Sequence, residues 1–373
     1  MEPIRILQVG MTSNYGGLES FVMNVYRNID RSKIQFDFLT LHDTEIAYQD
    51  EILKMGGRIY PILYKRREFL KRYMSLPYSF FKKHPEIKGV HLHRTNLIDI
   101  DILVVAKQCN IPIRIIHSHS TGYMFPVKKP IKLVEKWNRK NISRIATHFL
   151  ACSKEAGEWM FDNNPFKVIP NAIDVNKFKY NHNTRLRIRE EYGIKDQNVV
   201  GHIGYFTDVK NHTFIIDVFN LYHKRNPNSI LVLIGDGPLK KNIIQKVSEL
   251  SLLDSVIFTG ISQNVHELLQ ILDVFIFPSK FEGFGISVVE AQAAGLPCLL
   301  SEKVTREVSL TNQVKYLPIN DPVIWANELN ATPLNGDREK SFEKIRLAGF
   351  DIKTIADEIE IFYEDIINKK KIN

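Results

Sequence analysis

Short apolar runs alternate with stretches of helical spacing along most of the chain, and this alternation limits the folds open to it. The first unit is IRILQVG at 4–10, followed by the glycine-containing MTSNYGG and then by LESFVMNVYRNI at 18–29 with helical spacing. A strand, a glycine turn and a helix in this order open an α/β unit, whose repetition builds a parallel sheet with helices on its faces. The pattern therefore predicts the α/β class.

The strand-like runs form two series separated by VIPNAIDVNKF at 168–178, which has the proline and turn residues of a connector. The first series is 4–10, 35–41, 58–63, 89–93, 113–119 and 147–153, and the second is 199–205, 229–237, 255–260, 274–279, 297–301 and 314–319. We expect two Rossmann-like doubly wound domains facing a cleft, one over 1–170 and one over 171–352. The last helical stretch, in 353–373, could pack against either, with the N-terminal domain as the expected partner.

The length of 373 residues and the apolar content of 44% suit two ordinary cores. No apolar run of about 18 residues occurs and the N-terminus lacks a secretory leader pattern, so neither secretion nor a membrane span is expected. Cys109, Cys152 and Cys298 stand apart without Cys-x-x-Cys spacing, which favours free thiols in a cytoplasmic, reducing compartment.

Positive charge is concentrated in the first half of the chain. Residues 1–180 hold 28 Lys and Arg against 17 Asp and Glu, a net charge of +11, whereas 181–373 hold 22 against 25, a net charge of −3. Two basic stretches, 64–88 and 126–144, suit an anionic membrane surface, and a solvated helix face with its aromatics in the core is the alternative. Nucleic acid is not expected, because no nucleic-acid-binding motif accompanies the charge. The first stretch interleaves Lys65, Arg66, Arg67, Lys71, Arg72, Lys82 and Lys83 with Phe69, Tyr73, Met74, Phe80 and Phe81.

Ligands of open parallel sheets bind outside the carboxyl ends of the strands, and four of these ends carry residues suited to chemistry. Gly16 and Gly17 lead into a helix, where glycines permit positive φ and free N–H groups can take an anion. His117 and His119 follow another strand and could donate to a sugar hydroxyl, move a proton or pack in the core. No third ligand follows at metal-binding spacing, so no metal site is expected.

The other two strand ends lie in the second series. Lys210 follows a glycine turn just before a helix and offers a compact positive charge to phosphate. FPSKFEGFGISVVEAQAAGLP at 277–297 places Glu282 before an expected helix start at Gly285, and Glu290 about one and a half turns inside it. A carboxylate accepts hydrogen bonds from adjacent hydroxyls, so this pair suits the two sugars that flank the diphosphate of a nucleotide sugar.

The stretch PSKFEGFGISVVEAQAAGLP closely resembles the signature of retaining GT-B glycosyltransferases of family 4, most closely bacterial enzymes of capsule and exopolysaccharide assembly. The motifs around it match in order over most of the chain, namely GG-x-E, HSH, IPNAID, GHIGYFTDVKNH, LIGDGPL and VIFTG. The resemblance implies that the N-terminal domain receives a saccharide acceptor carried on a polyprenyl diphosphate, and that the C-terminal domain holds a UDP- or GDP-sugar. It also implies a peripheral location at the inner face of the cell membrane.

Roles carry over to the matching positions of this sequence. The resemblance implies that Glu282 contacts donor-sugar hydroxyls, Glu290 binds the ribose, Lys210 contacts the diphosphate, and His119, ahead of His117, faces the transferred sugar. The donor is also expected to lie against Gly16, Gly17 and the helix start formed by Phe284, Gly285 and Ile286. Tyr205 departs from the family, which usually has a diphosphate-binding arginine there.

The implied reaction is hexose transfer with retention by front-face attack, in which the leaving phosphate takes the acceptor's proton. Lys210 and the helix start would stabilise the phosphate charge without a metal or another cofactor. Two alternatives stay open. One is a GT-B epimerase, and the other is a catalytically weak partner subunit, which Tyr205 alone favours.

Overall fold

The computed structural model describes residues 2–41, 43–63, 68, 75–123, 127–334 and 338–371. The chain divides into two compact units. Unit 1 consists of Met1–Ala172 together with Ile352–Asn373, and unit 2 consists of Ile173–Asp351. The chain therefore passes from unit 1 to unit 2 and returns for its last helix.

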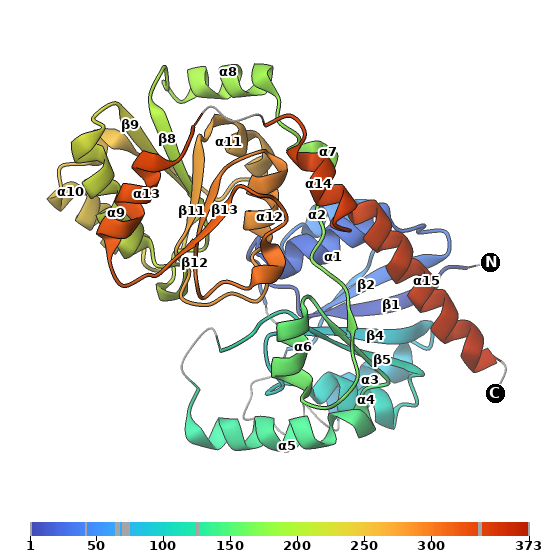
Figure 1. The fold of residues 1–373 in the computed structure, drawn as a ribbon. Coiled ribbons are helices and arrows are strands. Elements are labelled where there is room, and N and C mark those ends of the chain that lie inside the picture. The colour runs from blue at the N-terminus through green and yellow to red at the C-terminus, as the bar shows by residue number, and fades with distance from the viewer. Residues whose placement is uncertain are drawn as a thin grey trace. The chain divides into compact units, whose positions relative to one another are not determined.

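Unit 1 is built on a seven-stranded parallel sheet in the order β3-β2-β1-β4-β5-β6-β7. Figure 1 labels its central strands β2, β1, β4 and β5. Its strands are β1 (Ile4–Val9), β2 (Ile34–Thr40), β3 (Ile59–Pro61), β4 (Ile87–Arg94), β5 (Ile113–Ser118), β6 (His148–Ala151) and β7 (Lys167–Val168). Its helices are α1 (Gly17–Asn28), α2 (Gln49–Lys54), α3 (Leu76–Lys83), α4 (Asp101–Gln108), α5 (Lys129–Ile145), α6 (Lys154–Phe161) and α15 (Ile352–Lys371).

The C-terminal helix α15 packs against α1 and completes the core of unit 1. Its buried residues Ile355, Ile359 and Tyr363 recur at intervals of four, which places them on one helix face. That face joins a core that contains Phe21 and Phe36. The last helical stretch of the sequence thus belongs to the unit formed by the start of the chain.

Unit 2 is built on a six-stranded parallel sheet in the order β10-β9-β8-β11-β12-β13. Its strands are β8 (Asn198–Ile203), β9 (Ser229–Ile234), β10 (Val256–Gly260), β11 (Val274–Phe277), β12 (Cys298–Ser301) and β13 (Val314–Leu317). Its helices are α7 (Val175–Phe178), α8 (His182–Glu191), α9 (His212–Arg225), α10 (Lys240–Glu249), α11 (Val265–Ile271), α12 (Ile286–Ala293), α13 (Pro322–Ala331) and α14 (Ser341–Leu347).

The α/β class and the two Rossmann-like parallel sheets are confirmed. Every strand-like run named from the sequence overlaps a strand. The short strand β7 was not expected, because its two exposed residues give no apolar signal. Among the described helices, none combines the length and the apolar character that a bilayer-spanning segment needs.

The basic stretch 64–88 is only partly described. Lys65, Arg66, Arg67, Phe69, Lys71, Arg72, Tyr73 and Met74, all in this stretch, lie outside the described residues. Phe80 and Phe81 on α3 are buried, with 8% and 4% of their surface exposed. The expectation that these two aromatics help to form a membrane contact is wrong, because α3 turns them into the core of unit 1.

Candidate active site

Lys210 and Glu282, 72 residues apart, form an ion pair in unit 2. Lys210 ends a short 3-10 turn, Asp208–Lys210, that follows β8, and Glu282 lies in the loop between β11 and α12. The strands β8 and β11 are neighbours in the sheet, so their carboxyl ends bring the two loops together. The ammonium of Lys210 also lies 4.6 Å from the centroid of the Phe277 ring.

Further contacts hold the two loops against each other. The backbone N–H of Lys280 donates to the carbonyl of Val209 at 2.8 Å, and the Lys280 ammonium pairs with Asp208 at 2.6 Å. The side-chain amide of Asn211 donates to the carbonyl of Pro278. These contacts hold in place the two loops that carry Lys210 and Glu282. Each of these two side chains keeps about a fifth of its surface exposed.

The helix α12 starts beside Glu282 at a glycine in the left-handed conformation. Gly285 has φ +79°, and a Cβ atom there would lie 3.3 Å from Cγ of Glu282. Glycine is therefore suited to this position on both conformational and steric grounds. Ile286 begins the helix with part of its surface exposed, whereas the ring of Phe284 is buried and stacks on Phe350 at 5.4 Å. The Phe284 side chain thus fixes the turn from inside the unit.

Glu290 lies inside α12, and its carboxyl group makes no hydrogen bond or ion pair with the described residues. The side chain is half-buried, but protein atoms surround the carboxyl group closely. The resulting desolvation raises the pKa of Glu290 to about 8, and the charge of Lys177 opposes this weakly. An unsatisfied carboxylate in such a place is costly unless a ligand supplies donors.

Glycines shape the rest of this edge of the sheet. Gly235 and Gly237, which follow β9, have φ of +137° and +154°. A Cβ atom on Gly235 would come within 2.2 Å of the carbonyl oxygen of Gly204, so the loops after β8 and β9 touch by their backbones. Tyr205, next to Gly204, is 42% exposed and projects from this contact.

Gly16 caps α1 in unit 1, and Gly17 is the first residue of that helix. Gly16 has φ −93°, and neither glycine is among the residues with positive φ. A Cβ atom on Gly16 would lie 2.8 Å from Oε2 of the buried Glu19. Glu19 in turn accepts from the backbone N–H and the hydroxyl of Thr12. The positive φ that glycine permits is thus not adopted at this pair, and the small size of Gly16 makes room for the carboxylate that holds the loop.

His117 and His119 meet two further histidines at the carboxyl ends of β4 and β5. His93 pairs with His117 in the parallel register, and His91 lies two residues before it on the same face of β4. Nδ1 of His93 lies 2.9 Å from Nε2 of His119, and Nε2 of His91 lies 3.2 Å from Nδ1 of His117. Burial lowers the pKa of all four histidines, to about 3 for His91 and His119, so the rings are neutral at pH 7.

From the sequence, no metal site was expected because His117 and His119 had no third ligand nearby. The structure brings further histidines beside them. Nitrogen atoms of His91, His93 and His117 all lie within 4.8 Å of one another, a spacing that a metal ion could use. His91 and His93 are two residues apart on β4, as His117 and His119 are two residues apart at the end of β5, so each pair lies on one face of the sheet. This spacing could have identified His91 and His93 as further candidates from the sequence. Glu19 was likewise present in GG-x-E without a role.

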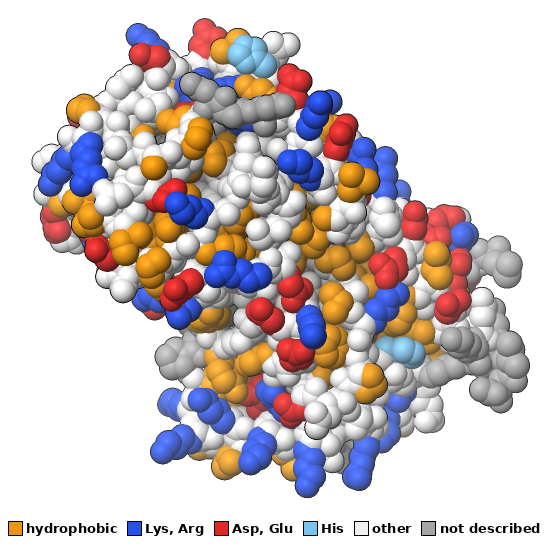
Figure 2. All heavy atoms as spheres, in the orientation of Figure 1, with side chains coloured by type: hydrophobic (Ala, Val, Ile, Leu, Met, Phe, Trp, Pro, Cys, Tyr) orange, Lys and Arg blue, Asp and Glu red, His pale blue; other side chains and the backbone are white. Residues whose placement is uncertain are grey.

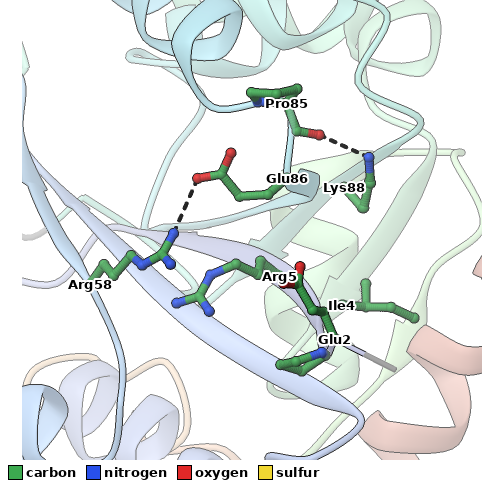
Figure 3. Close-up of a pocket in the computed structure, with 8 residues that line it drawn as sticks. Glu2, Ile4, Arg5, Arg58, Pro85, Glu86 and Lys88 are labelled. Atoms are coloured by element: carbon green, nitrogen blue, oxygen red, sulfur yellow. Dashed lines mark hydrogen bonds and ion pairs between the residues drawn. The ribbon is translucent and has the colours of Figure 1, made fainter.

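A cavity lies at the amino-terminal ends of the unit 1 strands, away from the candidate residues. It has a volume of about 750 Å³ and is lined by residues at the start of β1 and β4, among them Arg5 and Lys88. Figure 3 shows Arg58 directed at Glu86 and Lys88 at the carbonyl of Pro85. These cations are already engaged, and the cavity is remote along the strands from the carboxyl ends that carry the candidate residues.

Comparison with known proteins identifies the protein family. Residues 15–177 match the family described as Glycosyltransferase Family 4, and residues 184–317 match the family described as Glycosyl transferases group 1. The protein is a glycosyltransferase of the GT-B type.

Whole-length relatives narrow this further. The chain is 33% identical over 357 residues to EpsF of Bacillus subtilis strain 168, classed as a glycosyltransferase, with 93% of each chain covered. It is 25% identical over 317 residues to the UDP-Gal:alpha-D-GlcNAc-diphosphoundecaprenol alpha-1,3-galactosyltransferase of Escherichia coli, with 81% of each covered. The chain belongs to glycosyltransferase family 4.

Solved structures agree in fold. HepE of Anabaena, whose crystal structure holds UDP-glucose, superposes with a TM-score of 0.79 at 17% identity, covering 97% of this chain and 99% of that one. At this identity the likeness concerns the fold.

Proposed function

We propose that the protein transfers a hexose from a nucleoside diphosphate sugar to a saccharide acceptor with retention of the anomeric configuration. The observation that carries the proposal is the arrangement at the strand ends of unit 2. There the ion pair of Lys210 and Glu282 lies beside the start of α12, and the same helix holds the unpartnered carboxyl group of Glu290.

Each of these groups has a task in donor binding. Lys210 lies close to a helix N-terminus, and the two together suit a diphosphate. Glu290 lacks a partner among the described residues, and the two hydroxyls of a ribose would supply the donors that it needs. Glu282, already held by Lys210, would accept from hydroxyls of the transferred sugar once the phosphate draws the ammonium away.

The reaction then depends on charge. Breaking the bond to the nucleoside diphosphate places negative charge on phosphate, and Lys210 and the α12 start stabilise it. The acceptor hydroxyl attacks from the same face and passes its proton to the leaving phosphate oxygen. By resemblance to the family that residues 15–177 match, His119 is assigned to the transferred sugar, and Gly16 and Gly17 are assigned to the donor diphosphate. No residue of the chain is assigned as a nucleophile, and no metal is assigned a step.

The acceptor is a saccharide on a polyprenyl diphosphate carrier, and the enzyme works at the inner face of the cell membrane. The Escherichia coli relative is named for such an acceptor, which supports this choice. The positive charge of the first half of the chain supports it independently. UDP is named with both the Escherichia coli relative and the Anabaena structure, so uridine is the first base to test.

Titration calorimetry with Glu290→Ala and Glu282→Ala tests the donor assignment. Glu290→Ala should weaken binding of UDP or GDP, because the ribose contact is present without a sugar. Glu282→Ala should bind free nucleoside diphosphate nearly as the wild type does and lose turnover of the nucleotide sugar. Equal loss of nucleoside diphosphate affinity in both variants would contradict the assignment, and a wild type that binds neither nucleotide would favour the partner-subunit alternative.

Release of nucleoside diphosphate tests the reaction class. It should require the acceptor, and it should persist in the presence of a chelator. A release that needs added Mg²⁺ or Mn²⁺ would contradict the metal-free step, and turnover of the nucleotide sugar without acceptor or release would point to the epimerase alternative.

A further inference from the structure

The helix α5 exposes apolar and cationic side chains on the same face. Leu133 is 68% exposed and Trp137 is 63% exposed, which is unusual for large apolar residues. At 3.6 residues per turn, Lys129, Lys136 and Lys140 fall with these two in an arc of about 100°. The opposite face is anchored in unit 1 by buried residues such as Ile142 and Ile145.

No acid interrupts this face. Glu135 is the one acidic residue of α5, and it is buried, where it accepts from the Tyr123 hydroxyl and from the backbone N–H of Leu97. Figure 2 shows Lys and Arg side chains gathered along the edge that α5 occupies in Figure 1. The exposed basic residues of the helix and its N-cap are Lys128, Lys129, Lys132, Lys136, Lys140 and Arg144.

We propose that this face of α5 docks on an anionic lipid bilayer. The helix lies parallel to the surface, with Leu133 and Trp137 at the boundary of headgroups and acyl chains and the lysines at the lipid phosphates. A purely electrostatic partner such as nucleic acid would leave the exposed Leu133 and Trp137 without a role. The proposal rests on the proposed function only in that a lipid-linked acceptor gives a reason for docking.

Co-sedimentation with vesicles of phosphatidylglycerol and phosphatidylcholine tests the docking. The triple variant Lys129→Gln, Lys136→Gln, Lys140→Gln should bind on the order of 100-fold more weakly than the wild type. The matched control changes Lys195, Lys224 and Lys241, three exposed lysines of unit 2, to Gln and should bind as the wild type does. Brominated lipid should quench the tryptophan fluorescence of the wild type, and Trp137→Phe should lose this quenching.

Equal vesicle binding by the α5 triple variant and the control, or quenching that survives in Trp137→Phe, would overturn the docking. Titration with UDP keeps this result apart from the proposed function. If the wild type binds UDP but not vesicles, the docking alone fails. If it binds vesicles through α5 but no nucleoside diphosphate, the proposed function fails.

A second, independent observation is that the buried histidines end a continuous hydrogen-bonded chain centred on Gln8 of β1. On one side, Oε1 of Gln8 lies 2.8 Å from Nε2 of His93, whose Nδ1 lies 2.9 Å from Nε2 of His119. On the other side, Nε2 of Gln8 donates to the Tyr363 hydroxyl of α15 at 3.4 Å. That hydroxyl lies 2.6 Å from Nδ1 of His91.

Because the four imidazole rings are neutral, the direction of donation is fixed along the whole series of hydrogen bonds. A neutral imidazole has one donor nitrogen and one acceptor nitrogen, so each contact decides the next. His93 must donate to the amide oxygen of Gln8, and its Nδ1 must then accept from Nε2 of His119. The amide nitrogen of Gln8 turns the Tyr363 hydroxyl toward Nδ1 of His91, whose Nε2 then donates to His117. All four histidines are thereby protonated on Nε2.

The two ends of this series of hydrogen bonds are ring nitrogen atoms of His119 and His117. Nδ1 of His119 and Nε2 of His117 are buried without a hydrogen bond in the described residues. In the direction set by Gln8, the His119 end is a bare acceptor and the His117 end is a donor. Reversing the Gln8 amide would invert every link and make the His119 end a donor.

We propose that Gln8 is a positioning residue that holds the four histidines in the Nε2-protonated form and keeps Nδ1 of His119 as an acceptor. The partner of that acceptor is a hydroxyl of the transferred sugar, and this last step rests on the proposed function. A sugar hydroxyl would satisfy the buried acceptor only in this tautomer.

Long-range ¹⁵N–¹H correlation spectra of protein labelled in histidine test the tautomers directly in the wild type. His91, His93, His117 and His119 should all carry the proton on Nε2. A mixed set, or a metal ion bound in stoichiometric amount by His91, His93 and His117, would overturn the proposal.

Two variants separate Gln8 from packing in general. Tyr363→Phe removes the other arm, so His119 should keep its tautomer while His91 and His117 change. Gln8→Leu should leave His119 a mixture and lower kcat for the nucleotide sugar on the order of 10-fold at unchanged UDP affinity. An unchanged His119 signal in folded Gln8→Leu, or the same change in Tyr363→Phe, would overturn the role of Gln8. Loss of UDP binding in the wild type would instead count against the proposed function.

Discussion

The carboxyl group of Glu290 has no hydrogen-bond donor among the residues that the structure describes. Burial raises the pKa of Glu290 to about 8, and Lys177 offsets this only weakly. Lys210 and Glu282 have the opposite arrangement, because each satisfies the other. Under the proposed function, a ligand would separate the ion pair of Lys210 and Glu282 and supply hydrogen-bond donors to Glu290.

The raised pKa of Glu290 predicts a pH-dependent cost in stability. Between about pH 4.5 and pH 8 the folded protein keeps a proton that the unfolded chain has released, so the free energy of unfolding falls as pH rises through this range. Glu290→Gln lacks this group and should gain stability relative to the wild type, by on the order of 2 kcal/mol at pH 8 after allowance for partial exposure.

Thermal unfolding at pH 5 and pH 8, without nucleotide, measures the difference between Glu290→Gln and the wild type. Gln292→Glu is unsuitable as a control, because Gln292 holds backbone groups of the following loop. Glu302→Gln, at an exposed site, should show no change in its difference from the wild type with pH. A Glu290→Gln difference that is the same at both pH values would contradict the raised pKa.

Among the elements, the ends of strands and the starts of helices position the groups of the proposed site. Backbone and side-chain hydrogen bonds connect the loops after β8 and β11. The helix α12 starts from Gly285, a glycine in the left-handed conformation beside Glu282. The helix start, the ammonium and the carboxylate are thus positioned by one short turn. In unit 1, the carboxylate of Glu19 holds the corresponding loop before α1.

Gly285→Ala should therefore affect both stability and nucleotide binding. The left-handed backbone costs an alanine about 1–2 kcal/mol, and the added methyl group presses on Glu282. Gly193→Ala is the matched control, because Gly193 has φ +68° with no atom within 4 Å of an added Cβ. Chemical denaturation should show a similar loss of stability in both variants, whereas calorimetry with UDP should show weaker binding only in Gly285→Ala. Equal UDP affinities would indicate that the turn does not position the phosphate site.

At the scale of the whole molecule, the chain forms two units, each with its own core. The return of α15 to unit 1 makes the last residues of the chain necessary for the core that the first residues begin. All the groups assigned to nucleotide binding by a charged side chain lie in unit 2. Stability and ligand binding should therefore be separable between the units.

Calorimetric unfolding should show two transitions that respond to different changes. Ile359→Ala, on the buried face of α15, should destabilise unit 1 by about 2–5 kcal/mol and lower only its transition. UDP at about 100 times its dissociation constant should stabilise unit 2 by about 2.7 kcal/mol and raise the temperature of its transition. Ile361→Ala is the control, since Ile361 is 57% exposed and its loss should change little. A single transition that both Ile359→Ala and UDP shift would show that the units unfold together.

The fold class and the order of elements could be predicted from the amino-acid sequence, because strand and helix periods and glycine turns are local properties of the chain. The runs at 4–10 and 274–279 became β1 and β11, and the helix expected near Gly285 begins at Ile286. The motif around Glu282 and Glu290 was likewise readable, since its residues lie close together in the chain.

Tertiary structure alone decided which of these residues meet. Lys210 reaches Glu282 because β8 and β11 are neighbours in the sheet, and Tyr363 reaches His91 because α15 returns to unit 1. It also decided which side chains are buried: the sequence offered Phe80 and Trp137 alike as aromatics among basic residues, yet one is core and the other exposed. Local periodicity cannot supply this information, because burial and contact depend on strand order and on helix packing between segments far apart in the chain.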